Sequence, residues 1–220
     1  LNIYDTCIKH KVKKLITPIS NCAYPGNLDY YEEKNFWNGK PHESVFNYAL
    51  TRRLIVAMGE AYYSQHKFTS CNLVLSNMYG KHDHFDEARS HALGAILDKI
   101  YSAKINNKES VTIWGTGSPI REWLYVEDGV KSLVKATQLA EGNYFFNIGV
   151  NKGISIKELA IKIAELLDWH GNFEYDLSRP DGAPEKRVDG SSALDYLKWE
   201  PDTSLEDGLI KTIDWYSNER

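Results

Sequence analysis

The chain has no apolar run of membrane-spanning length, few cysteines and no excess of basic residues. The missing apolar run argues against a transmembrane helix, and the first residues lack the pattern of a signal peptide. The three cysteines are widely spaced and form no CxxC pair, so we expect reduced thiols in a cytoplasmic protein. The net charge of −4 disfavours nucleic acid and anionic membranes as partners.

A glycine-rich phosphate-binding turn is also missing from the sequence. An open parallel sheet that binds a dinucleotide uses a first strand, a GxGxxG-type turn and a helix N-terminus for the pyrophosphate. Gly115 and Gly117 lie late in the chain, and no third glycine completes the pattern. The sequence therefore offers no phosphate-binding half for such a sheet.

Strand and helix patterns alternate along the chain. Short apolar segments predict strands at 13–20, 69–76, 111–114, 122–126 and 144–148. Longer periodic segments predict helices at 44–66, 87–103 and 128–139, and two more from capping boxes that start at Ser155 and Thr203. The alternation favours a parallel α/β sheet, with a smaller and mostly helical part built mainly from the final third of the chain.

The helix expected at 44–66 carries Tyr48 and Arg52 four residues apart. Side chains at this spacing are neighbours on one helix face. A cation about 6 Å from a phenol, at an effective dielectric constant of about 20, favours the phenolate by roughly 3 kcal/mol, or about two pKa units. A tyrosine tuned in this way can exchange a proton with a carbonyl or an alcohol near neutral pH. A packing pair at the surface is the plain alternative.

The order of the motifs resembles the extended short-chain dehydrogenase/reductase family. A strand ends in Ser20-Asn-Cys22, the Tyr48 helix follows, and Asn77-Met-Tyr-Gly80 comes after the next strand. The similarity continues through Ser90-His91, residues 114–128, Asn147-Ile-Gly149 and residues 180–184, so it covers essentially the whole chain. Within that family the motifs are most similar to those of the GDP-L-fucose synthase group, which are 3,5-epimerases and 4-reductases of a GDP-4-keto-6-deoxyhexose.

The resemblance implies the C-terminal part of a doubly wound parallel (Rossmann-type) sheet with a smaller, mostly helical substrate-binding domain. The dinucleotide-binding part would comprise residues 1–80 and 122–150, and the substrate-binding domain residues 81–121 and 151–220. The N-terminal phosphate-binding half would not be present in this chain. The residues that distinguish NADP from NAD lie in that half, so they would be missing too. The resemblance also implies a homodimer formed through the Tyr48 helix.

Reduction of a 4-keto sugar needs a hydride donor and an acid for the forming alkoxide. By resemblance, Tyr48 is that acid and Ser20 hydrogen-bonds the same oxygen. Arg52 stands where the family has the lysine that holds the nicotinamide ribose. Arginine keeps the charge but is longer, forked and unable to deprotonate. The resemblance therefore does not carry over a proton relay through this side chain. Cys22 and His91 match the pair that removes and returns a carbon-bound proton during epimerisation.

The remaining candidates bind ligands. The resemblance implies that Asn77 and Tyr79 line the nicotinamide end of the cofactor. An anionic nucleotide diphosphate needs cations, and Arg121 matches a substrate-contacting arginine of the family. Lys99 stands where an arginine is expected, which keeps the charge but loses the bidentate geometry. The predicted substrate-binding set is completed by Trp114, Asp181 and Lys186.

We therefore expect NADPH-dependent 4-reduction, with 3,5-epimerisation, of a GDP-4-keto-6-deoxyhexose, and NAD as a possible cofactor instead. One alternative is a C4-reductase or an NAD-dependent 4-epimerase of another nucleotide sugar, such as a deoxyheptose. Arg52 and the missing glycine-rich turn leave open a non-catalytic homologue that binds a nucleotide sugar. The loop at 82–86 gathers histidine and aspartate but matches no zinc spacing, so no metal site is expected.

Overall fold

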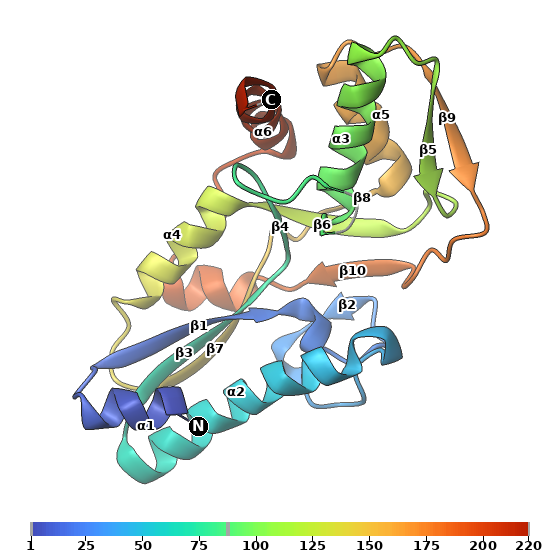
Figure 1. Ribbon diagram of the computed structural model, residues 1–220. Coiled ribbons are helices and arrows are strands. Elements are labelled where there is room, and N and C mark those ends of the chain that lie inside the picture. The colour runs from blue at the N-terminus through green and yellow to red at the C-terminus, as the bar shows by residue number, and fades with distance from the viewer. Residues whose placement is uncertain (1, 87–88, 220) are drawn as a thin grey trace.

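A parallel three-stranded sheet with helices on both faces is the main layer of the computed structural model, which describes residues 2–86 and 89–219 (Figure 1). Its strand order is β1-β3-β7, formed by β1 (Lys14–Ser20), β3 (Thr69–Leu75) and β7 (Asn143–Ile148). The central strand β3 is buried along its whole length. Strand β1 pairs only with β3 among the described residues, so it is a half-buried edge strand.

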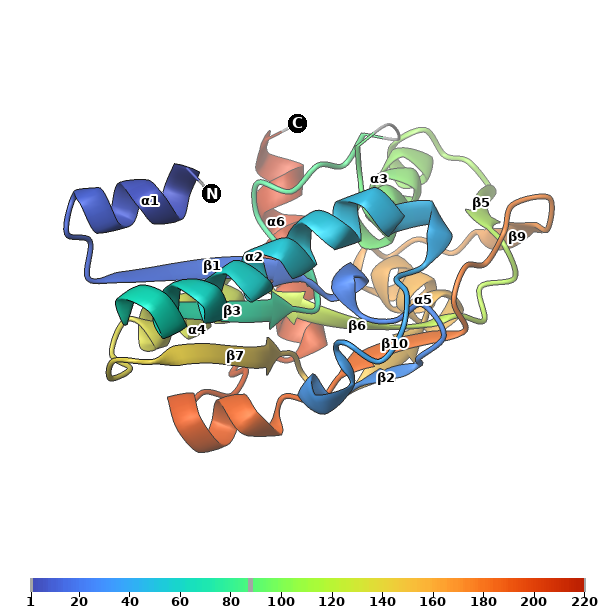
Figure 2. The same cartoon turned by 90° about the horizontal axis from the view of Figure 1, so that it is seen from below.

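Helix α2 (Phe46–His66) runs along one face of this sheet (Figure 2). The helix backbone approaches β3 closely at Gly59, where an added Cβ would lie 2.6 Å from the Ser70 hydroxyl oxygen. Lys67, with a positive φ of 56°, ends the helix. Helix α1 (Asn2–Lys9) packs beside the C-terminal end of α2. The opposite face of the sheet is covered by α4 (Val126–Ala136) and the helical turn η4 (Ala193–Leu197).

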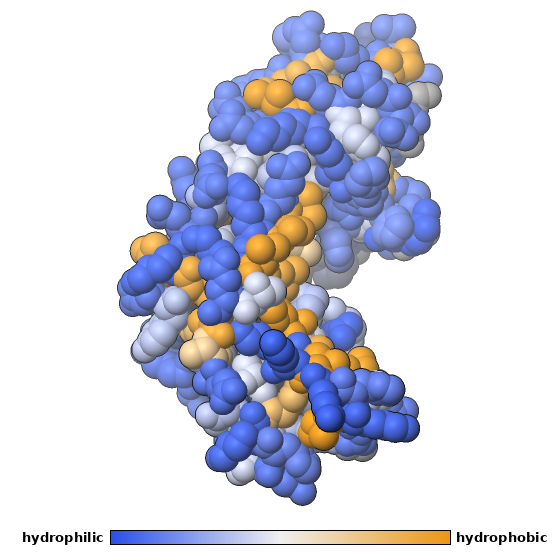
Figure 3. Space-filling model, turned by 90° about the vertical axis from the view of Figure 1, so that its left-hand side faces the viewer, coloured by the Kyte–Doolittle hydropathy of each residue, from blue (hydrophilic) through white to orange (hydrophobic). Residues whose placement is uncertain are grey.

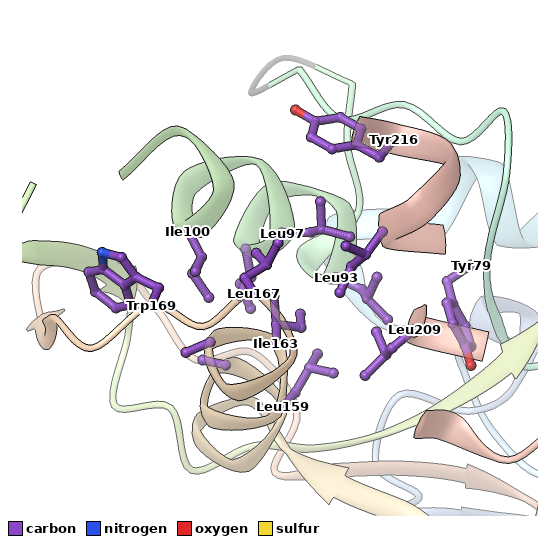
Figure 4. Close-up of a cluster of buried hydrophobic side chains, with 14 of the residues drawn as sticks. Tyr79, Leu93, Leu97, Ile100, Leu159, Ile163, Leu167, Trp169, Leu209 and Tyr216 are labelled. Atoms are coloured by element: carbon purple, nitrogen blue, oxygen red, sulfur yellow. The ribbon is translucent and has the colours of Figure 1, made fainter. Parts of the chain in front are cut away.

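A second sheet and a helical layer lie beyond the carboxyl ends of the first sheet (Figure 1). This sheet has the order β2 (Tyr30–Tyr31), β10 (Glu185–Val188), β6 (Ile120–Tyr125) and β4 (Asn77–Tyr79), with β8 (Gly153–Ser155) antiparallel to β6. A separate parallel pair is formed by β5 (Ser110–Trp114) and β9 (Asn172–Asp176). The buried cluster in Figure 4 joins the helices α3 (Ala92–Ile105), α5 (Ile156–Leu166) and α6 (Leu205–Glu219). Single turns of 3₁₀ helix occur at η1 (Asn21–Ala23), η2 (Glu33–Asn35) and η3 (Glu43–Val45).

The α/β class and the parallel sheet predicted from the sequence are confirmed. The prediction of a helix at 87–103 is wrong at its start, because His91 has an extended backbone, with φ −77° and ψ 167°, that does not continue a helix toward Ser90. The helix begins only at Ala92, and residues 87 and 88 lie outside the described residues. The helix expected at 128–139 is found at Val126–Ala136. The division into two domains stays a prediction.

The two expected capping boxes differ in outcome. The box at Ser155 is confirmed, since its hydroxyl accepts from the Glu158 N–H and the Glu158 carboxylate accepts in return. The box at Thr203 is wrong by one residue. The Thr203 N–H donates to the buried carboxylate of Asp128 at 2.9 Å, and the cap is Ser204, whose hydroxyl accepts from the Asp207 N–H. A long-range hydrogen bond therefore displaces the helix start.

The face around β1 carries apolar side chains at the surface. A groove of about 490 Å³ lies between α1, β1 and α2, and its lining includes Ile3, Leu15 and Leu54. Figure 3 shows a band of apolar residues on this side of the molecule, bordered by hydrophilic ones. None of the helices in residues 2–86 and 89–219 has the length and apolar character needed to cross a membrane.

Candidate active site

The carboxyl ends of β1 and β3 border an open cavity of about 760 Å³, which we call the strand-end cavity. Parallel strands end at the same edge of a sheet, so residues far apart in the sequence meet there. The lining includes every residue predicted to be catalytic or to bind the cofactor, namely Ser20, Cys22, Tyr48, Arg52, Asn77, Tyr79 and His91. Their roles stay predictions, but the structure places all of them around one cavity.

Helix α2 presents Tyr48 and Arg52 on the cavity wall. The Arg52 guanidinium carbon lies 4.6 Å from the centroid of the Tyr48 ring, in a cation–π contact. The ring is 46% exposed, so a ligand can reach it from the cavity. The expected i, i+4 neighbourhood is therefore present, with the cation held over the ring of the phenol.

The turn η1 fixes Ser20 and Cys22 relative to each other. Ser20 caps this turn, and its hydroxyl oxygen accepts the Cys22 N–H at 3.2 Å. The Cys22 thiol is half-buried at the cavity, whereas Cys7 and Cys71 are buried elsewhere. Burial raises the pKa of Cys71 to about 12, so that thiol stays protonated at neutral pH. Of the cysteines, Cys22 is therefore the one placed for chemistry in the cavity.

His91 enters the cavity from a different part of the fold. It occupies the N-cap position of α3 with an extended backbone, and its carbonyl accepts the Ala95 N–H. Among the described residues, no group of three or more histidine, cysteine, aspartate or glutamate side chains could hold a metal ion. The cavity lining also contains residues that the sequence prediction missed, and these are Asn21, Ser76, Met78, Lys81, His82 and Asp83.

The polar groups of Asn77 and Tyr79 are used inside the protein. The Asn77 amide donates to the Glu122 carbonyl at 3.2 Å, which ties β4 to β6. The Tyr79 hydroxyl donates to the Leu205 carbonyl at 3.3 Å, and burial raises the pKa of this phenol. Both residues therefore shape the cavity wall, while their hydrogen bonds tie β4 to β6 and to the start of α6.

A second cavity, of about 350 Å³, lies in the helical layer and is called here the Trp114 cavity. Four of the predicted substrate-binding residues line it, namely Lys99, Trp114, Arg121 and Asp181. The Lys99 ammonium lies 5.0 Å and the Arg179 guanidinium carbon 4.8 Å from the centroid of the Trp114 ring. Lys186 pairs with Arg121 in the β10–β6 register but lies outside the lining of both cavities. The Trp114 cavity therefore combines an aromatic surface with several cations.

The carboxylate of Asp181 holds a loop over the Trp114 cavity. Its two oxygens accept the Thr116 N–H at 2.7 Å and the Thr116 hydroxyl at 2.8 Å. Gly115 has a φ of +73°, and a Cβ at this position would overlap with the carboxylate. Arg121 donates to the Asp181 carbonyl at 3.4 Å, and burial lowers the pKa of this guanidinium. Asp181 therefore positions the loop that closes one side of the cavity.

A buried carboxylate next to Arg121 was not predicted from the sequence. Glu122 accepts hydrogen bonds from the backbone N–H groups of Val150, Asn151 and Val188, the last at 2.8 Å. Burial raises its pKa to about 7, although these N–H groups act in the opposite direction. This side chain joins β6 to β10 and to the loop after β7, and no local sequence signal indicates its burial.

Comparisons with known proteins agree with this arrangement. The model of the NAD dependent epimerase/dehydratase family matches residues 1–149. GDP-L-fucose synthase 1 of Arabidopsis thaliana is 35% identical over 216 residues, which are 98% of this chain and 67% of the relative. The GDP-L-fucose synthase of Escherichia coli is 30% identical over 225 residues, covering 98% of this chain and 70% of the relative.

Two solved structures share the fold over nearly the whole chain. A GDP-L-fucose synthetase from Naegleria fowleri aligns with a TM-score of 0.90 and 25% identity, covering 99% of this chain and 69% of that one. The GDP-mannoheptose C4 reductase MlghC from Campylobacter jejuni, solved with NADP bound, gives a TM-score of 0.84 and 25% identity, covering 98% of this chain and 73% of that one. The chain thus spans about two thirds of the length of its relatives.

Proposed function

Because the chain belongs to the NAD dependent epimerase/dehydratase family, we propose that the protein carrying it is a nucleotide-sugar reductase and epimerase. Its substrate in this proposal is a GDP-4-keto-6-deoxyhexose, its cofactor is NADPH, and the carbons beside the ketone are epimerised before reduction. The observation that carries the proposal is the strand-end cavity, which gathers Ser20, Cys22, Tyr48 and His91. The similarity to GDP-L-fucose synthases supports the choice of substrate.

The strand-end cavity fits the nicotinamide end of such a cofactor. It lies at the carboxyl ends of parallel strands, and the Arg52 cation stands on its wall. Tyr48, Arg52, Asn77 and Tyr79 would hold this end of the cofactor, which supplies a hydride when bound. Tyr48 gives its proton to the oxygen of the reduced ketone, and Ser20 donates a hydrogen bond to the same oxygen.

Cys22 and His91 perform the epimerisation in this proposal. Removal of a proton from a carbon beside a ketone needs a base, and inversion needs an acid on the other face of the sugar ring. The two side chains come from η1 and from the start of α3, so they approach the cavity from separate elements. One of them takes the proton as thiolate or neutral imidazole, and the other returns one.

The Trp114 cavity receives the nucleotide diphosphate in this proposal. Lys99, Arg121 and Arg179 supply positive charge next to the indole, which suits a ligand with both a flat base and phosphate groups. Asp181 lines the same cavity and keeps the loop in place through Thr116. A homodimer formed through α2 stays part of the proposal.

A second candidate is a plain C4 reductase of a GDP-heptose. The structural likeness to a GDP-mannoheptose C4 reductase favours it. Such a reductase needs Ser20 and Tyr48 but has no use for an acid and base pair. The presence of Cys22 and His91 in the same cavity therefore favours the reductase and epimerase.

A substrate screen tests the proposal. The protein is mixed with NADPH and GDP-4-keto-6-deoxymannose, a GDP-4-keto-heptose or a UDP-4-keto sugar, and NADPH oxidation is followed by absorbance. We expect the fastest oxidation with the 6-deoxymannose derivative. We also expect loss of about 99% of the rate or more in Tyr48→Phe, because a general acid contributes roughly 10²–10⁴-fold. Tyr63→Phe is the matched control, since Tyr63 has Lys67 over its ring on the same helix but lies outside the cavity lining. Equal rates in both variants, or no oxidation with any sugar, would contradict the proposal.

A further inference from the structure

Two buried polar side chains lie at the point where β1 and β3 end. The strand register pairs Ser20 with Leu75, and Asn21 and Ser76 are the residues that follow them. Both side chains are buried, with exposed fractions of 4% and 5%. Both also line the strand-end cavity. The strand ends therefore bring an amide and a hydroxyl to the wall of the same cavity.

Neither side chain has its hydrogen bonds completed by the described residues. The Asn21 amide nitrogen and the Ser76 hydroxyl oxygen are buried and have no partner in residues 2–86 and 89–219. A buried donor without a partner destabilises a protein, so most are satisfied. Other side chains with such an atom, including Arg53, Asn72 and Trp123, do not line the strand-end cavity. At the cavity wall, a ligand can provide the missing partner.

The polar neighbours of this pair are already engaged within the protein. The Ser20 hydroxyl oxygen accepts from Cys22, and the Asn77 amide donates to Glu122. Asn21 and Ser76 are both neutral donors, whereas the charge on this wall comes from other residues. Rotation of the Asn21 amide about its last side-chain bond exchanges the nitrogen and the oxygen, so either atom can face a ligand. The pair can thus bind an uncharged oxygen of a ligand.

We propose that Asn21 and Ser76 bind a neutral oxygen of the ligand in the strand-end cavity and position the reacting groups through it. The proposal rests on the proposed function and goes beyond it, because neither residue belongs to the predicted site. Two ligands offer such an oxygen, namely the sugar ring with a hydroxyl beside the ketone and the nicotinamide with its carboxamide. Asn21 stands between Ser20 and Cys22 in the sequence, and all three residues line the strand-end cavity.

The variants Asn21→Leu and Ser76→Ala test this inference, with Asn72→Leu as matched control. Asn72 is a buried amide with unpartnered atoms on β3, away from the strand-end cavity. Melting temperatures are measured without ligand, and calorimetric titrations use GDP, GDP-mannose, NADPH and 2′,5′-ADP. We expect all three variants to keep or raise the melting temperature, since each removes an unpartnered donor. We also expect Asn21→Leu and Ser76→Ala, but not Asn72→Leu, to weaken binding by about tenfold.

The titrations separate the two sources of the oxygen. If the variants bind GDP-mannose more weakly but GDP with unchanged affinity, the oxygen belongs to the sugar. If they bind NADPH more weakly but 2′,5′-ADP with unchanged affinity, the oxygen belongs to the nicotinamide carboxamide. Asn21→Ala repeats the test if the leucine variant fails to fold. Lower melting temperatures with wild-type affinity in both cavity variants would show that the two residues are structural. That result would overturn this inference and leave the proposed function untouched. A wild-type protein that binds neither GDP-mannose nor NADPH contradicts the proposed function as well.

Discussion

Replacement of Glu122 by glutamine should remove a pH dependence from the stability of this protein. The Glu122 carboxylate is buried on β6 and accepts backbone hydrogen bonds from Asn151 at 3.0 Å and from Val188 at 2.8 Å. Burial raises its pKa from 4.5 to about 7, and the backbone N–H groups and Arg187 oppose the rise only in part. The folded protein therefore holds a proton on Glu122 at a pH where the unfolded chain has lost it.

The sign and size of the effect follow from this difference. Because the folded pKa is the higher one, the stabilisation by the proton is complete below pH 4.5 and is lost as the pH rises to about 7. At about 1.4 kcal/mol per pH unit, the free energy of unfolding falls by roughly 3 kcal/mol across this range. Glutamine carries no titrating proton, so Glu122→Gln lacks this slope. Its amide nitrogen cannot accept the Val188 N–H, which lowers the stability by an amount that does not depend on pH.

Urea unfolding followed by tryptophan fluorescence measures the effect. The free energy of unfolding is determined for wild type and Glu122→Gln at several pH values from about 4.5 to about 7.5, and other titrating groups cancel in the difference. Glu200→Gln, at an exposed carboxylate, is the control. We expect the difference between wild type and Glu122→Gln to shrink by roughly 3 kcal/mol toward neutral pH. A difference that stays constant over the whole range would refute the assignment of a raised pKa to buried Glu122.

Substitutions at three further positions have expected outcomes. Gly149→Ala should lower the free energy of unfolding by roughly 1–3 kcal/mol in the same urea titrations, because a Cβ there would overlap with Glu122 and Val188. Lys14→Met should lower it by roughly 1–3 kcal/mol, since the Lys14 ammonium donates to three carbonyl groups at the end of α4, and an unchanged value would show that these bonds contribute nothing. Arg52→Lys should keep or raise the rate of NADPH oxidation and Arg52→Met should nearly abolish it, whereas equal rates would make the contact with Tyr48 purely structural.

Local patterns in the sequence were sufficient for the longer strands and helices, whereas the short strands β2, β4, β8, β9 and β10 were not predicted. Apolar periodicity depends on near neighbours, so the Tyr48 helix and the strand that ends at Ser20 were predictable. Cys22 and Asn77 were predicted because they stand in motifs that resemble those of the family, and local patterns alone would not have singled them out.

Contacts between distant residues could not be predicted in this way. The Asp181 carboxylate binds Thr116, 65 residues away, and nothing around either residue indicates this pairing. Asp128 displaces the start of α6 through Thr203, 75 residues later in the chain. The placement of Asn21 and Ser76 on one cavity depends on the register between β1 and β3, which only the folded sheet fixes.

Deuterium exchange tests most directly the central claim that one cavity carries out both epimerisation and reduction. The protein is incubated in heavy water with GDP-4-keto-6-deoxymannose and without NADPH, and deuterium in the sugar is measured by mass spectrometry and NMR. We predict incorporation at the carbons beside the ketone, slowed about tenfold or more by Cys22→Ser, which should leave reduction of an already epimerised substrate largely intact. If the wild-type protein incorporates no deuterium and yet oxidises NADPH with the same substrate, it is a plain 4-reductase, and Cys22 and His91 have no part in the chemistry.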